Sequence, residues 1–103
     1  MFKLQPEPTF WATVDIPLPG GETAPLDLEL RWLPESERRA LVAGLNEETP
    51  GVEVLRKLVV GWRDVDTPFS DDALATLSAN YPGAAWSVLR EYPKHLAGAK
   101  RKN

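Results

Sequence analysis

The sequence predicts an α+β fold, in which an N-terminal antiparallel β-hairpin or small sheet is followed by about four helices packed on one of its faces. Three observations predict this fold. Polar and apolar residues alternate in the first third of the chain, apolar residues recur at helical spacing after Pro34, and 103 residues is the length of one domain. Within this single domain we expect a β-hairpin region over residues 1–33, a helical region over 34–98 and a disordered basic tail over 99–103.

Two alternating segments predict the hairpin. Residues 9–16 (TFWATVDI) and 26–32 (LDLELRW) carry an apolar side chain at every second position, which is typical of strands with one buried face. Trp32 shares its face with three leucines, so we expect it in the core. The connecting residues 17–25 contain three prolines and a Gly-Gly pair, which favours a long connection between the strands.

Helical spacing begins after Pro34. A first helix is expected over residues 35–45 (ESERRALVAGL), with Ser36 as its N-cap. Its apolar side is expected to consist of Leu41, Val42 and Leu45.

A second helix is expected to begin at Pro50, with its apolar stripe over residues 52–62. Thr49 is its expected N-cap and Pro50 its first residue, because the fixed φ angle and the missing N–H of proline suit that position. Its apolar stripe consists of Val52, Leu55, Leu58, Val59 and Trp62, and we expect Trp62 to be its last core residue.

Two further helices complete the prediction. Ser70 is expected to cap the third, with Asp71 and Asp72 in its first turn, where the positive end of the helix dipole favours acids. The sequence NYPG ends this helix, and the fourth begins near Gly83. Pro93 falls inside the apolar pattern of the fourth helix, so we expect a kink or a break there.

Composition excludes several classes of site. The chain has no cysteine, so it holds neither disulfides nor thiolate metal sites. Its N-terminus lacks the apolar core of a signal peptide, and no apolar run approaches the roughly 20 residues that span a bilayer, so we expect a cytoplasmic protein. The net charge is −3, yet residues 94–103 sum to +4 and residues 1–93 to −7. Nucleic-acid binding needs a basic face on the folded part, which this distribution does not favour.

No pattern of residues indicates catalysis. The one histidine, His95, lies in the basic segment without an obvious partner, which argues against a catalytic triad and against a two-histidine metal site. Asp64, Asp66, Ser70 and Asp72 have the spacing of calcium-loop ligands, but the loop's glycine and final glutamate are missing. We therefore expect no enzyme activity, no cofactor and no metal.

Binding of a partner is the remaining function class. Alternation puts Trp11 on the polar face of its strand, where it is a candidate interface residue unless a neighbouring segment covers it. Trp86, at the margin of the fourth helix's stripe, either packs at a boundary or binds. An open sheet edge could also accept a partner strand. The candidate partner-binding residues are Trp11, Thr13, Arg31, Trp86, Lys100, Arg101 and Lys102.

Several motifs, in order along nearly the whole chain, resemble those of one family. They are F-x-L-x-P-x-P-T-F at residues 2–10, V-x-I-P-x-P-G-G at 14–21, V-V-G-W-x-x-V-D-x-P-F-S at 59–70, Y-P-G-A at 81–84 and the terminal K-R-K-N. In combination they resemble the small tail assembly chaperones of tailed phages and prophages. Trp86 and Pro93 belong to none of these motifs.

The resemblance implies a chaperone that acts in the cytoplasm of the bacterial host. Such a protein binds the long, helical tape measure protein, keeps it soluble while tail tube subunits polymerise around it, and is absent from the mature virion. In many phages a frameshifted longer form also recruits the tail tube protein. The alternative is a small non-catalytic domain that binds nucleic acid or an acidic partner through the basic segment from Lys94 to Lys102. Self-association is open in both cases.

Overall fold

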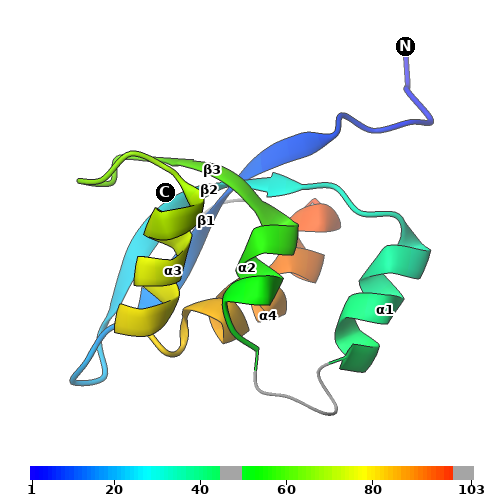
Figure 1. Cartoon of the computed structure of the whole chain (residues 1–103). Helices are drawn as coiled ribbons and strands as arrows, with labels where there is room; N and C mark the ends of the chain where they lie inside the picture. The colour runs from blue at the N-terminus through cyan, green and yellow to red at the C-terminus, as the bar shows by residue number, and fades with distance from the viewer. Residues whose placement is uncertain (45–49, 99–103) are drawn as a thin grey trace.

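The alternating N-terminal residues form a three-stranded antiparallel sheet with the third strand added from later in the chain, in the order β1-β2-β3. The computed structural model describes residues 1–44 and 50–98. Figure 1 shows the helices on one side of the sheet and the N-terminal arm, residues 1–8, pointing away from the body. The predicted α+β class is confirmed. The elements are β1 (Thr9–Pro17), β2 (Thr23–Arg31), α1 (Glu35–Gly44), α2 (Val52–Leu58), β3 (Val59–Arg63), α3 (Asp71–Asn80) and α4 (Ala84–Leu96).

The hairpin is longer, and its turn shorter, than expected. β1 and β2 pair along their whole length. In the turn, Gly20 and Gly21 have φ angles of 94° and 96°, which glycine adopts without steric cost. Pro25 lies inside β2 rather than in the connection. β3 pairs with β2 only over residues 27–30, so at residue 25 the edge of β2 that faces β3 has no partner strand. A proline is tolerated at such an edge position.

The last four residues of the second expected helix, 59–62, belong to a strand, and that part of the prediction was wrong. α2 ends at Leu58, and β3 pairs with β2 inside the region expected to be helical. Two β-branched valines favour extended backbone, and pairing with β2 satisfies the backbone groups of both strands. Gly61 permits the close approach, because a Cβ there would lie 3.0 Å from Glu29 Oε1.

This change of element moves Trp62 out of the deep core position expected for it. Trp62 is half-buried and packs edge-on against Phe69, with ring centroids 5.2 Å apart and planes at 90°. Its Nε1 donates a hydrogen bond to the Thr67 carbonyl at 2.8 Å. Trp62 therefore holds the loop between β3 and α3 against the body.

Two of the expected helix starts differ in the structure. Helical hydrogen bonding already begins at the Pro34 carbonyl, so Ser36 lies in the first turn of α1 and is not its N-cap. Gly51 is the N-cap of α2, with extended backbone, so Pro50 precedes the helix. Thr49 lies outside the described residues.

The starts of α3 and α4 follow the prediction. Ser70 Oγ accepts a hydrogen bond from the Ala73 amide at 3.0 Å, which confirms the cap. The NYPG turn separates the two helices as expected. A kink or a break was expected at Pro93; α4 continues through Pro93 to Leu96, so the helix does not break there. The proline removes only one hydrogen bond of the helix, near its C-terminal end.

α1 buries less apolar surface than expected. Leu41 is buried, whereas Val42 is 58% exposed, and Leu45 lies outside the described residues. Trp32 is also only partly buried and lies outside the core cluster. β2 ends before Trp32, so the strand alternation no longer applies there, and Leu33 is buried instead.

The core fills the space between the inner face of the sheet and the helices. It is built from alternate residues of β1 and β2 and from the apolar stripes of α2 and α4. Fully buried members include Val14, Leu28, Leu30, Leu55, Leu58 and Val88.

Tyr92 joins α4 to the point at which the chain leaves the sheet. Its hydroxyl accepts a hydrogen bond from the Leu33 amide at 2.9 Å and donates one to the Arg31 carbonyl at 2.8 Å. The centroid of its ring lies 5.9 Å from that of Phe10. Burial raises the pKa of the Tyr92 hydroxyl, because a phenolate would be poorly solvated there.

Replacing Tyr92 by phenylalanine is expected to lower the free energy of unfolding by about 1–3 kcal/mol, because the Leu33 amide and the Arg31 carbonyl lose their partner while the ring remains. Urea unfolding measures the change. Tyr81→Phe, at a partly exposed ring, is the matched control and should have a smaller effect. Equal stability of Tyr92→Phe and the wild type would show that the two hydrogen bonds contribute nothing net.

The raised pKa of Tyr92 predicts a loss of stability at alkaline pH. Below about pH 10 the hydroxyl is protonated in both the folded and the unfolded chain, so its contribution is constant. As the pH rises further, the unfolded chain releases this proton first, and the free energy of unfolding falls until the folded-state pKa is reached. The difference in stability between the wild type and Tyr92→Phe, measured by urea unfolding, should therefore shrink as the pH rises above about 10, and a constant difference would contradict the assignment.

Candidate partner-binding surface

The outer face of the sheet, opposite the core, carries several of the side chains singled out from the sequence. Residues that face each other across antiparallel strands project from the same side of the sheet. On the outer face these pairs are Thr9 with Arg31, Trp11 with Glu29, and Thr13 with Asp27. The structure therefore brings together three of the predicted partner-binding residues, Trp11, Thr13 and Arg31.

Trp11 is neither covered by a loop nor fully free. The side chain is 40% exposed, and Arg63 Cζ lies 4.2 Å from the centroid of its ring. This is a cation–π contact, which fixes the orientation of the indole. Arg63 Nε also pairs with Asp27 Oδ2 at 3.3 Å. Trp11 thus presents a pre-oriented, partly exposed aromatic surface next to a cation.

The polar neighbours of Trp11 are bonded to one another. Thr13 Oγ1 donates to Asp27 Oδ1, and Thr9 Oγ1 donates to Glu29 Oε2 at 2.8 Å. These threonines lie two residues before and two residues after Trp11 on β1, and their hydrogen bonds hold the carboxylates of β2 in place. The part of the outer face around Trp11 is therefore an ordered surface of one indole, the carboxylates of Asp27 and Glu29, and the Arg63 guanidinium.

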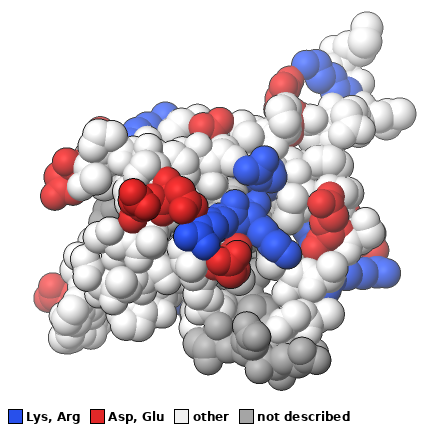
Figure 2. Space-filling view, viewed as in Figure 1, with Lys and Arg blue, Asp and Glu red and all other residues white. Residues whose placement is uncertain are grey.

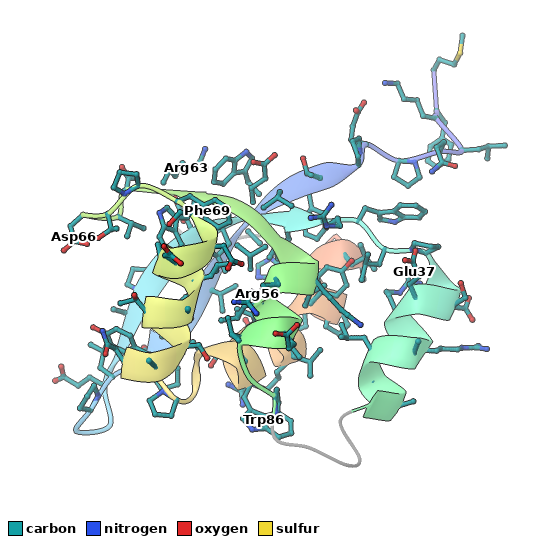
Figure 3. All side chains as sticks on the ribbon, in the orientation of Figure 1. Glu37, Arg56, Arg63, Asp66, Phe69 and Trp86 are labelled. Atoms are coloured by element: carbon teal, nitrogen blue, oxygen red, sulfur yellow. The ribbon has the colours of Figure 1, made fainter. Side chains whose placement is uncertain are left out.

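Arg31 lies at the end of this face, where its Nε donates a hydrogen bond to the Lys57 carbonyl at 3.2 Å. The remaining predicted binding residues lie elsewhere. Trp86, which is 47% exposed, belongs to the first turn of α4, and Figure 3 shows it far from Arg63, at the opposite end of the molecule. The structure therefore does not bring Trp86 to the outer sheet face. Lys100, Arg101 and Lys102 lie outside the described residues.

Charged side chains are unevenly distributed over the helical side. Figure 2 shows basic side chains gathered in the middle of this face, over α2, with acidic side chains next to them. Arg56 bonds to acidic side chains on two helices. Its Nε donates to Asp71 of α3 at 2.7 Å, and its Nη1 donates to Glu53 of α2 at 2.6 Å. The hydrogen bond to Asp71 is the main reason why the pKa of Arg56 is raised. This cluster joins α2 to α3.

Within residues 1–44 and 50–98, no three histidine, aspartate or glutamate side chains gather as a metal ion would require. Tyr92 and Arg56, whose pKa values are raised, both take part in the packing contacts described above. No helix in this part of the chain is long and apolar enough to cross a membrane.

Reasoning from the sequence missed two exposed residues that shape the surface. Arg63 was expected beyond the end of a helix, and only the pairing of β3 with β2 brings it over Trp11. Val42 was assigned to the apolar side of its helix together with Leu41. Adjacent helical residues point about 100° apart, so a helix that buries one of them can leave the other in solvent.

Comparison with known protein families identifies the family to which the chain belongs. The model of a family described as phage tail assembly chaperone matches residues 1–103, which is the whole chain. No curated protein and no solved structure matches the chain. The family match includes both the outer sheet face and the helical region. The chain therefore belongs to a family of phage tail assembly chaperones.

Proposed function

We propose that this chaperone binds the tape measure protein of its phage and keeps it soluble until tail tube subunits polymerise around it. The match of the whole chain to a phage tail assembly chaperone family carries the proposal. A long helical protein that awaits assembly exposes apolar stripes, and exposed apolar surface leads to aggregation unless a partner covers it. The chaperone acts in the cytoplasm of the bacterial host and is absent from the mature virion.

The surface of the protein supports this function. Trp11, Val42 and Trp86 are all at least 40% exposed although they are large and apolar. Exposed tryptophan next to arginine is the composition typical of binding hot spots. We place one partner contact on the outer sheet face, around Trp11, Thr13 and Arg31. Trp86 and the basic tail residues Lys100, Arg101 and Lys102 are separate contacts.

Co-expression tests the proposed function. The tape measure protein encoded beside this chain should be largely insoluble alone and become several-fold more soluble when this chain is co-expressed, as measured by the fraction that remains in the supernatant. An unrelated acidic protein of similar size serves as the control for general effects of expression. An unchanged soluble fraction would reject the tape measure protein as the partner.

Trp11→Ala is expected to weaken partner binding more than it weakens folding. The side chain is partly exposed, so most of its energetic contribution is available to an interface rather than to the core. Calorimetry with a soluble tape measure fragment should show about tenfold weaker binding, the loss of one moderate hot spot. Thermal unfolding of the same variant provides the comparison, and parallel losses of binding and stability would contradict this role.

A further inference from the structure

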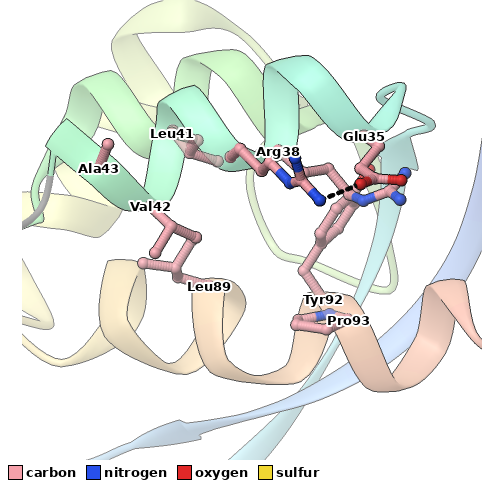
Figure 4. Close-up of a pocket in the computed structure, with 9 residues that line it drawn as sticks. Glu35, Arg38, Leu41, Val42, Ala43, Leu89, Tyr92 and Pro93 are labelled. Carbon is pink, nitrogen blue, oxygen red and sulfur yellow. Dashed lines mark ion pairs between the residues drawn. The ribbon is translucent and has the colours of Figure 1, made fainter.

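Two hollows flank α1. The first, of about 420 Å³, lies between α1 and α4, and Figure 4 shows Val42 and Leu89 facing each other across it. The second, of about 320 Å³, lies on the other side of α1, next to Leu33 and Lys57. Leu41 borders both hollows and is the buried residue of α1. α1 therefore forms a ridge between two surface depressions with apolar floors.

The walls of these hollows are basic, although the chain as a whole is acidic. Five basic and two acidic side chains line them. Arg56 is already paired with Glu53 and Asp71, and the other lining groups, four basic and two acidic, leave an excess of positive charge, whereas the whole chain has a net charge of −3. Arg39 is one of the most exposed of these, with 79% of its side chain accessible and an ion pair to Glu35. The basic side chains are Arg31, Arg38, Arg39, Arg56 and Lys57, and the acidic ones are Glu35 and Glu37.

We infer that α1 and the two hollows form a docking surface for an amphipathic helix whose apolar stripe is flanked by acidic side chains. The inference rests on the proposed function and names the kind of segment that this chaperone holds. Basic walls around an apolar floor are complementary to an acidic border around an apolar stripe. Arg31 stands at the end of the outer sheet face and also lines one hollow, so the two surfaces are continuous.

The shape of the surface favours a helix over an extended strand. The ten residues of α1 span about 15 Å, which matches two to three turns of a partner helix. The lining of the first hollow comes from side chains on facing helices, α1 and α4, as in other helix-binding grooves. An extended segment would instead pair with free backbone groups at a sheet edge. The hollows are lined by side chains next to α1, so they do not offer such an edge.

The N-terminal arm of a second copy fits this surface less well. Met1, Phe2 and Leu4 of the arm are exposed and apolar, so they could cover an apolar floor. Pro6 and Pro8 oppose helix formation, however, and the arm's one acid, Glu7, is already paired with Lys3 at 2.7 Å, so the arm brings no free acidic border to the basic walls. Charge complementarity therefore favours a separate acidic helix as the occupant.

Designed peptides test the inference with the full-length protein. The probe is a peptide of about 15 residues, roughly four helical turns, with a leucine stripe flanked by glutamates, and its counterpart replaces the glutamates with lysines. Fluorescence anisotropy should show that the glutamate peptide binds at least about tenfold more tightly and that added salt weakens this binding. Equal binding of the two peptides would overturn the inference.

Matched variants locate the binding. Val42→Glu, which places an acid on the floor of the first hollow, and Arg39→Glu, which reverses a charge on its wall, should each weaken binding of the glutamate peptide by about tenfold. Ala79→Glu on an exposed position of α3 and Lys3→Glu on the arm are the controls and should bind as the wild type does. Circular dichroism verifies that all four variants fold.

Two results would contradict the location or the occupant. Equal effects of the variants and their controls would place the peptide elsewhere. A dimer in sedimentation that Val42→Glu dissociates and that the glutamate peptide does not compete with would identify a second copy as the occupant.

The same variants separate this inference from the proposed function. If Val42→Glu solubilises the tape measure protein as well as the wild type does, the docking surface is wrong and the proposed function stands. If the wild type fails to solubilise that protein but binds the glutamate peptide through Val42 and Arg39, the proposed partner is wrong and the docking surface stands.

Discussion

The position of the helices relative to the sheet depends on one side chain, Tyr92. Its ring is buried on α4, and its hydroxyl holds both the last carbonyl of β2 and the Leu33 amide. These two backbone groups lie where the chain turns from the sheet toward α1. Because one hydroxyl satisfies both, the exit of the chain is fixed without regular secondary structure, and the direction of α1 follows from it. Tyr92 therefore lines the hollow between α1 and α4 and also fixes the direction of the chain that leads into α1.

The addition of β3 has the next largest effect. It ends α2 after seven residues, supplies the second partner of β2, and carries Arg63 to the outer face of the sheet. Without this strand Trp11 would have no cation next to its ring. The same pairing leaves Trp62 at the start of the loop that leads to α3, where it packs on Phe69. Residues 59–63, whose pattern fits the end of a helix, thus determine both the closure of the core and the composition of the outer sheet face.

Two neighbouring surfaces emerge on a protein of this family, and Arg31 connects them. The outer sheet face offers an oriented indole bordered by carboxylates and a guanidinium. The surface around α1 offers apolar floors bordered by arginine and lysine. The partner proposed above is a long helical protein, whose apolar stripes need to be covered without recognition of one short sequence, and surfaces of mixed apolar and charged character suit that need.

The sequence by itself determined the α+β class, the hairpin, the Ser70 cap and the positions of α3 and α4, because alternation, capping residues and turn residues act over a few neighbouring positions. It also placed Trp11 and Thr13 on one face, since strand alternation requires it. Only the tertiary structure decided that residues 59–63 form a strand, that Trp32 and Val42 stay partly or largely exposed, and that Arg63 covers Trp11. Val59 is apolar and buried in β3, and an apolar residue at this position also fits the helical stripe of residues 52–62, so the sequence pattern does not distinguish a helix from a strand there. The free edge of β2, far away in the sequence, selects between them.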